Sequence, residues 1–402
     1  MTKTSDFTEF QAQLRLARTE TPLKVMATAH TVEGVLQARL LLSDIDVDRY
    51  DDVIVTPQNR ATGLGLLRTE RFFRFADELD ALRVLILGPQ LVDAKHYSHA
   101  AEMVLNHENR WLHDLFLANS GCQSVVRTLC MPLNKLFPVD LDLGELTRKY
   151  GIDPAQAKRW IRDGLQESET FHGCRGARLH TLRQDLATLQ IEAILRAASA
   201  TLAEGGEVDL TILVSMVTFP EEVTLYMALF DRVYEKMLAA HHRLPEVKLA
   251  IMVETSAAYH DIERFVELKG KHIGFAGALF GGNDFTAATL NLNRHDAVRN
   301  VIPQYLKLGI LRRNPFVTLH ADTVGMVICN GLWRMRKAAH GKPLCIGFGG
   351  EQAGDWESVS WLSRHATIEG LKYVSNSPDR IPEALFAAAA AGSLAGRTQR
   401  YA

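Results

Sequence analysis

The sequence predicts an α/β protein, a (β/α)8 TIM barrel with helical insertions. From residue 23 onward, short apolar runs of β type alternate with longer amphipathic stretches, which indicates parallel strands joined by helices. The number of strand candidates is close to the eight that close such a barrel. Because no internal repeat and no linker rich in Ser, Gly or Pro interrupts this pattern, we predict one domain over residues 23–402, after an N-terminal extension of residues 1–22.

The strand candidates in chain order are "LKVMATA" (23–29), "ATGLGLL" (61–67), "SVVRTL" (124–129), "TILVSM" (211–216), "VKLAIMV" (247–253), "HIGFAGALF" (272–280), "KPLCIGF" (342–348) and "LKYVSNS" (371–377). Amphipathic helices are expected at 31–44, 220–242 and 257–268. Residues 89–121 and 143–170 are predicted as helical insertions, the second containing a helix that starts at the Asp-Pro turn of "GIDPAQAKRWIRDGL". The alanine-rich stretch 381–396 is a strong helix former that ends in glycine.

The composition excludes several classes of protein. Of 402 residues, 47% are hydrophobic and 23% are charged, as in an ordinary soluble globular protein. The formal net charge of −2 gives no bulk attraction to nucleic acid or to a membrane surface. Five cysteines without metal-type spacing, and no apolar window of membrane-spanning length, favour reduced thiols and a cytoplasmic location.

Polar side chains follow most of the predicted strands, where a barrel carries its chemistry. Glu254 and Asp284 end neighbouring strands, and two carboxylates are the minimum protein contribution to a Mg2+ ion that keeps waters and takes further ligands from a substrate. Arginines supply planar forks for phosphate and carboxylate oxygens. The other polar residues at these ends are Arg68, Glu70, Arg127, Arg175, Asn283, Glu351, Ser375, Asn376 and Ser377.

Each of these residues also has a purely structural interpretation, in rim ion pairs, helix caps or turns. Their joint occurrence in strand order favours a site. The sequence therefore predicts a cavity for an anionic, phosphorylated acid held together with Mg2+.

Several motifs resemble the phosphoenolpyruvate (PEP)/pyruvate-binding barrel domain of the PEP-utilising enzymes, and within them the pyruvate, phosphate dikinase family. "GLGLLRTERFF" is similar to G-[IL]-G-L-x-R-T-E-x-x-F, and "RTLCMPLNKLFP" aligns without a gap on R-L-L-D-P-P-L-H-E-F-L-P. "HGCRGAR" resembles R-G-C-R-L, "IMVET" resembles I-M-I-E-x-P, and "FGGNDFTAATLNLNR" resembles F-G-T-N-D-L-T-Q with a trailing arginine. The resemblance runs from about residue 23 to the C-terminus.

The resemblance implies a role for each matching residue. Glu254 and Asp284 would hold Mg2+, and Asn283 would contact the substrate carboxylate or phosphate, on a floor formed by Gly281 and Gly282. Ser375 is a further candidate for substrate binding. Arg68, Arg127, Arg175 and Arg294 would neutralise phosphate and enolate oxygens during transfer of a phosphoryl group between PEP and a histidine.

The chain departs from the family pattern at several positions. The family's proton donor is a cysteine in a C-G-E stretch after the seventh strand, and Gly349 stands there in this sequence. Cys345 is on the same strand, but roughly 13 Å away, too far to replace that donor directly. Asp-Pro-Pro becomes Cys130-Met131-Pro132, the first arginine of R-G-C-R becomes His172, and Gly282 and Ala287 replace Thr and Gln.

The functional expectation is a Mg2+-dependent, stand-alone PEP/pyruvate-binding enzyme that transfers a phosphoryl group through enolpyruvate, with a phosphohistidine domain on another polypeptide. "HYSHAAEM" resembles a phosphohistidine core but lacks its Gly-Gly, so we predict Ser98 as a helix cap with His99 in the first turn. Family members pair through this barrel, which implies a homodimer. The alternatives are a PEP-sensing pseudoenzyme and a lyase, aldolase or carboxylase that acts on an enolate.

Overall fold

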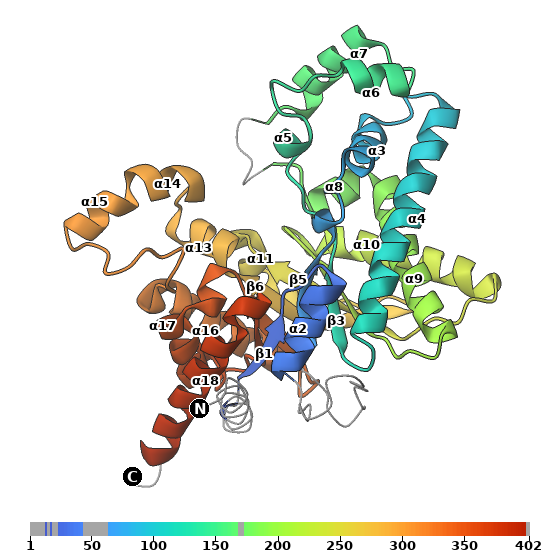
Figure 1. Ribbon diagram of the computed structural model, residues 1–402. Coiled ribbons are helices and arrows are strands. Elements are labelled where there is room, and N and C mark those ends of the chain that lie inside the picture. Colours follow the sequence, from blue (N-terminus) through green and yellow to red (C-terminus); the bar gives the residue numbers. More distant parts are fainter. Residues whose placement is uncertain (1–12, 14–16, 18–22, 43–62, 168–172, 399–402) are drawn as a thin grey trace, which may run out of the picture.

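The computed structural model describes residues 13, 17, 23–42, 63–167 and 173–398. Eight parallel strands close a barrel in chain order, which confirms the predicted (β/α)8 TIM fold (Figure 1). All eight strand candidates are strands. Their bounds are β1 Lys24–Ala27, β2 Leu64–Arg68, β3 Gln123–Arg127, β4 Asp209–Val214, β5 Val247–Val253, β6 Ile273–Gly281, β7 Cys345–Gly349 and β8 Tyr373–Asn376.

Alternate residues of each strand face the inside and the outside of the barrel. The interior is a small apolar cluster that contains one or two side chains from most strands, among them Met26, Leu213, Met252 and Tyr373. The residues between them pack outward against the helices in the largest core cluster. Both faces of the sheet are thus buried, which is why these strands read as nearly continuous apolar runs.

Tyr373 fills the barrel interior where β2 and β7 carry glycine. A Cβ atom at Gly65 would lie 2.9 Å from the Tyr373 ring, and one at Gly347 would overlap that ring. Large and small residues on facing strands therefore complement each other, as in a close-packed core.

Helices follow the strands and cover the barrel (Figure 1). They are α2 Val32–Leu42, α9 Gln184–Ala203, α10 Pro220–Ala239, α11 Ser256–His260, α12 Ile262–Val266, α13 Gly282–Leu290, α16 Met326–Ala338, α17 Trp356–Trp361 and α18 Ile381–Thr398. Short helical turns complete these connections: η1 Thr69–Arg71, η3 Ala321–Gly325, η4 Glu351–Gly354, η5 Leu362–Ala366 and η6 Pro378–Arg380. The alanine-rich helix is confirmed and runs past Gly396, where its end was expected.

Two long connections form a helical lobe beside the C-terminal ends of β2 and β3 (Figure 1). It consists of α3 Ala76–Leu87, α4 Ala94–Ala118, α5 Leu133–Leu136, α6 Gly144–Lys149, α7 Pro154–Trp160, η2 Ile161–Leu165 and α8 Ala177–Leu182. This lobe has a hydrophobic cluster of its own. The predicted helical insertions are confirmed over residues 89–121 and 143–167, and residues 168–170 of the second lie outside the described residues. Asp153 caps α7 ahead of its N1 proline, as the Asp-Pro turn indicated.

The predicted cap at Ser98 is wrong. Helix α4 begins earlier, at Ala94, because the Asp93 side chain accepts the hydrogen bond of the His96 backbone N–H. Ser98 and His99 therefore lie inside the helix rather than at its start, and both are exposed.

A pair of short helices, α14 Arg294–Asn300 and α15 Ile302–Lys307, extends away from the barrel after α13 (Figure 1). It has a minor apolar cluster that includes Ala297, Ile302 and Phe316. Across the described ranges, no helix is both long and apolar enough to cross a membrane. The N-terminal extension lies almost wholly outside the described residues, and the single-domain assignment stays a prediction.

A glycine pair in β6 tests how tightly the barrel is closed. A Cβ atom at Gly277 would overlap the backbone carbonyl oxygen of Cys345 on β7, whereas one at Gly274 would meet nothing within 4 Å. We expect Gly277→Ala to lower the free energy of unfolding by about 3 kcal/mol, because backbone atoms cannot yield as a side chain can. Gly274→Ala, the matched control, should change it by less than about 1 kcal/mol. Urea denaturation followed by circular dichroism measures both, and equal effects would contradict this packing.

Candidate functional site

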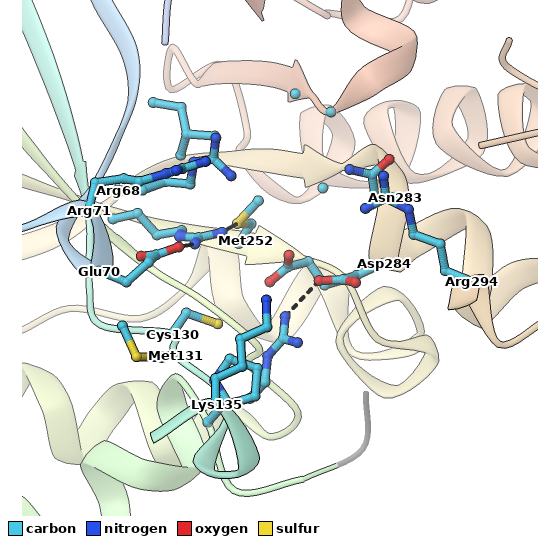
Figure 2. Close-up of a pocket in the computed structure, with 18 of the residues that line it drawn as sticks. Arg68, Glu70, Arg71, Cys130, Met131, Lys135, Met252, Asn283, Asp284 and Arg294 are labelled. Carbon is cyan, nitrogen blue, oxygen red and sulfur yellow. Dashed lines mark hydrogen bonds and ion pairs between the residues drawn. The ribbon is translucent and has the colours of Figure 1, made fainter. Parts of the chain in front are cut away.

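A cavity of about 450 Å3 opens at the C-terminal ends of the strands (Figure 2). It brings together every residue to which the sequence assigned a role except Gly282 and Ser375. Of the other strand-end residues, Glu70 lines the cavity, and Glu351, Asn376 and Ser377 do not. Residues from β2, β3, β5, β6 and β7 and the loops that follow them line it: Leu66, Arg68, Glu70, Arg71, Arg127, Cys130, Met131, Pro132, Lys135, Arg175, Met252, Glu254, Gly281, Asn283, Asp284, Asn293, Arg294, His295, Gly349 and Gly350.

Two carboxylates form the centre of this cavity. Glu254 follows β5 and is 1% exposed, with Oε2 accepting a hydrogen bond of 2.9 Å from the Met216 backbone N–H. Asp284 is in the first turn of α13. Burial, together with the negative charge of Asp284, raises the pKa of Glu254 to about 7. Two like charges held this close favour a bound cation.

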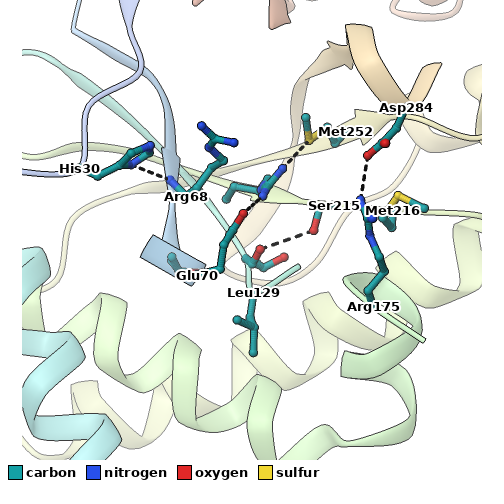
Figure 3. Close-up of polar contacts among 12 residues, drawn as sticks. His30, Arg68, Glu70, Leu129, Arg175, Ser215, Met216, Met252 and Asp284 are labelled. Carbon is teal, nitrogen blue, oxygen red and sulfur yellow. Dashed lines mark hydrogen bonds and ion pairs between the residues drawn. The ribbon is translucent and has the colours of Figure 1, made fainter. Parts of the chain in front are cut away.

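Two arginines that line the cavity are fixed by acidic partners (Figure 3). Arg127 ends β3 and forms an ion pair with Glu70. Arg175 precedes α8, and its Nη2 lies 2.7 Å from Asp284 Oδ2. Both arginines are largely buried, so their guanidinium groups are held in one orientation toward the cavity. Planar guanidinium groups fixed in this way suit phosphate or carboxylate oxygens.

Arg68 ends β2 and is supported through its backbone by His30. The Arg68 N–H donates to His30 Nδ1 at 3.4 Å (Figure 3). Burial and the positive charge of Arg68 lower the pKa of His30 to about 3, so the ring is neutral and able to accept this bond. Burial and the charge of Arg127 lower the pKa of Arg68 itself, as expected for a cation among cations. Arg68 is thus poised for an anionic ligand.

The glycines after β6 have different roles. A Cβ atom at Gly281 would lie 2.7 Å from Glu254 Cγ, so Gly281 leaves room for that buried carboxylate. Gly282 does not line the cavity; it packs against Gln352 and Phe348, where a Cβ atom would lie 2.6 Å from Gln352 Oε1. Asn283 lines the cavity, and its buried Oδ1 has no partner among the described residues. These residues form the N-terminal turn of α13, whose dipole favours an anion.

Ser375 is placed outside the cavity. Its hydroxyl group lies 2.7 Å from Thr28 Oγ1 and donates to the Ala27 carbonyl oxygen, between β8 and β1. The residue is buried in β8, below the strand end that faces the cavity. The structure thus gives Ser375 a role in strand pairing.

The donor set at Glu254 and Asp284 fits Mg2+. Both are hard oxygen donors, and neither Glu254 oxygen is in an ion pair with a cationic side chain among the described residues. In the part of the chain that the structure describes, no group of three or more His, Cys, Asp or Glu residues is arranged to hold a metal ion. A Mg2+ ion at this site would therefore need oxygen ligands from water and substrate.

The comparison with known families is decisive. Residues 27–392 match the family described as PEP-utilising enzyme, PEP-binding domain. The chain belongs to this PEP-binding domain family.

Similarity to individual members is moderate. The chain is 31% identical over 371 residues to pyruvate, phosphate dikinase 2 of Zea mays, covering 91% of this chain and 38% of that protein. It is also 31% identical over 370 residues to the chloroplastic pyruvate, phosphate dikinase 1 of Arabidopsis thaliana, and the match covers 91% of this chain and 35% of that protein. The chain thus spans little more than a third of these relatives. The structural superposition on a solved malate synthase of Haloferax volcanii covers 91% of this chain and 72% of that chain, at 11% sequence identity and with a TM-score of only 0.41.

Gly349, where the family resemblance places an acid cysteine, has room for a side chain. A Cβ atom at Gly349 would make ordinary contacts, at 3.4 Å from Leu279 Cδ2, and the backbone there does not require glycine. Gly350, in contrast, has φ +131°, which a residue with a side chain rarely adopts. Cys345 is at the start of β7, near the Gln123 amide, and does not line the cavity. The only cysteine side chain among the lining residues is Cys130, a thiol whose pKa burial raises.

Sequence reasoning missed several lining residues, chiefly Arg71, Lys135, Met252 and His295. Arg71 and Lys135 are within the two PEP-binding family segments that were recognised, three and eight residues after the matched arginines Arg68 and Arg127. Met252 is two residues before Glu254, on the same face of β5. His295 is next to Arg294. The period of the strand and the adjacency to matched residues were the available signals.

A buried polar network supports two loops of the site. Gln190 Oε1 accepts from the Leu129 backbone N–H at 2.9 Å, and Nε2 donates to Thr69 Oγ1 at 3.1 Å and to Glu108 Oε1 at 3.0 Å. Thr69 is beside Arg68, and Leu129 is beside Cys130. One glutamine on α9 therefore fixes the backbone after β2 and after β3.

Glu108 makes stability depend on pH. Burial raises its pKa to about 8 from an ordinary value of 4.5, although the Gln190 hydrogen bond lowers it in part. Between these values the unfolded chain has released the proton and the folded protein has not, so the free energy of unfolding falls as pH rises. We expect the advantage of Glu108→Gln over wild type to grow by about 3 kcal/mol from pH 5 to pH 8.

Urea denaturation at four pH values measures this difference, and Glu102→Gln, on the exposed side of the same helix, is the control. Because other titrating groups are common to both proteins, they cancel in the comparison. A difference that stays constant with pH would contradict a buried neutral Glu108.

Proposed function

We propose that the chain is a Mg2+-dependent enzyme that binds PEP or a pyruvate-like acid. In this proposal it transfers a phosphoryl group, through enolpyruvate, to or from a histidine on a separate phosphohistidine domain. The observation that supports it is the meeting of Glu254 and Asp284 with Arg68, Arg127 and Arg175 in one cavity. The homodimer and the cytoplasmic location expected from the sequence remain predictions.

The arginines would stabilise the charge that moves during transfer. As the bond between phosphorus and the enol oxygen breaks, negative charge develops on that oxygen, and the phosphorus bonds to an imidazole nitrogen. Arg127, held by Glu70, and Arg175, held by Asp284, are oriented in advance and need no reorganisation. Arg68 and the Asn283 amide would bind the remaining phosphate and carboxylate oxygens.

Glu254 and Asp284 would hold Mg2+ between them. The ion, when bound, would neutralise charge on ligand oxygens. The two carboxylates would also orient the ligand, since the hydrogen bond from Met216 and the ion pair to Arg175 restrict their rotation.

The binding part of the proposal has a direct test. Calorimetric titration of the protein with oxalate, PEP and pyruvate in Mg2+ should give heat for each, and the affinity for oxalate should fall at least about tenfold without Mg2+. Asp284→Asn should cause a similar loss because it removes a charged oxygen donor and the partner of Arg175. Asp379→Asn, an exposed matched change in η6, should bind as wild type. No heat with any ligand would sink the proposal.

A second candidate function is binding without turnover, as in a sensor. The observation in its favour is Gly349, which has no side chain and so cannot protonate an enolate at the position of the family's acid. A lyase, aldolase or carboxylase reaction of the enolate is compatible with the same feature. These candidates differ from the first in whether the enolate carbon reacts at all and, if it does, whether it takes up a proton or forms a bond to another carbon.

Replacement of Gly349 separates them. The cavity has room for a Cβ atom there, so Gly349→Cys should accelerate the exchange of pyruvate methyl protons in D2O by at least about tenfold. Gly349→Ser has nearly the same size but a far weaker acid and should change the rate little. Proton NMR follows the exchange. If the wild type already exchanges as fast as Gly349→Cys, another group moves the proton and the sensor hypothesis is wrong.

A further inference from the structure

The cavity carries more positive charge than its own carboxylates balance. Six arginine and lysine side chains line it, against three glutamate and aspartate side chains. Two of the acidic groups are already used, Glu70 by Arg127 and Asp284 by Arg175. Net positive charge in a concave site attracts and orients anions.

The unbalanced cations are concentrated in the segments after β2 and β3. Arg68, Arg71 and Lys135 form no ion pair with any carboxylate of the described residues. Arg71 is in η1, and Lys135 is in α5. Figure 2 shows Lys135 rising from α5 into the cavity. An exposed lysine is usually just solvated, but this one points at the ligand space and has two unpaired arginines across from it.

The same segment differs in charge from the dikinase pattern that it resembles. In the ungapped alignment of "RTLCMPLNKLFP" with the dikinase pattern R-L-L-D-P-P-L-H-E-F-L-P, Cys130 stands for Asp and Lys135 stands for Glu. These two replacements remove two negative charges and add a positive one. Cys130 and Lys135 both line the cavity, so the change acts on the ligand.

PEP does not account for this much charge. It carries about −3 at neutral pH, from a phosphate and a carboxylate. The lining side chains carry a net +3, or +2 once the Glu351 carboxylate that pairs with Arg294 is counted, and Mg2+ would add two more. The cavity, at about 450 Å3, also leaves space beside Gly349, where a side chain would fit.

We infer that the ligand carries a second carboxylate, bound by Lys135 with Arg71, in addition to the groups held by Arg68, Arg127 and the two metal-binding carboxylates. The substrate class is therefore a 2-oxo dicarboxylic acid or its enol phosphate, rather than pyruvate or PEP itself. This inference rests on the proposed function and specifies its substrate.

Competition against oxalate in Mg2+, measured by calorimetry, tests the inference. The probes are racemic lactate and racemic malate, which differ by one carboxylate and do not turn over as enolates. The wild type should bind malate about tenfold more tightly than lactate, the value of one charge-assisted contact. Lys135→Met should remove most of this preference, and Lys135→Glu, which restores the family's charge, should reverse it. Lys158→Met, an exposed change in α7, is the control.

The ratio of the two affinities is the readout. Because loss of any cavity charge weakens binding of the dianion more than that of the monoanion, the ratio must fall further in Lys135→Met than in Arg294→Met, which removes one positive charge elsewhere in the cavity. Equal displacement by lactate and malate in the wild type, or an unchanged ratio in Lys135→Met, would overturn the inference alone, since oxalate binding still supports the site. If oxalate does not bind at all, the proposed function fails and this inference fails with it.

Discussion

The site depends on a carboxylate that is buried without a salt bridge of its own. Glu254 is almost completely inaccessible, accepts one backbone hydrogen bond, and lies beside a second carboxylate. An uncompensated buried charge is costly, so its surroundings must offset it. The positive charges of Arg127 and Arg175 do so, and Gly281 leaves the space that the glutamate fills. The neighbouring strands, the helix start at α13 and the paired arginines are all arranged around this one group.

Much of the fold and most of the site could be predicted from sequence because both rest on local patterns. Apolar runs locate the strands, and their C-terminal ends meet in any closed parallel barrel, so Arg68, Arg127, Glu254 and Asp284 converge without further information. Ser375 was misplaced because strand-end position does not fix whether a hydroxyl group points to the cavity or to the next strand. The start of α4 was missed because Asp93 competes with Ser98 as a cap.

The spatial positions of residues on the long connections could not be predicted from the sequence, even where a residue lies in a matched segment, as Lys135 does. Gln190 lies in the middle of α9 and looks like an ordinary helix residue. Its side chain nevertheless forms hydrogen bonds with Thr69 and Leu129, which lie in the connections after β2 and β3. Lys135 is on a four-residue helix whose orientation depends on how the lobe packs. Membership of the PEP-binding domain family, shown over residues 27–392, indicates the chemistry of the ligand that such a domain binds. It does not determine how the departures at Cys130, Lys135 and Gly349 alter that chemistry.

The separate hydrophobic cluster of the helical lobe divides the cavity wall into two mechanically distinct parts. Leu129, Leu133 and Leu136, which flank Cys130 and Lys135, pack into the lobe, while Val253 and Phe285, beside Glu254 and Asp284, pack into the main core. Mutations in the lobe can therefore shift the segment after β3 with little disturbance of the two carboxylates. A change of ligand preference can then arise from substitutions in one wall, while the packing around the two carboxylates in the other wall stays as it is.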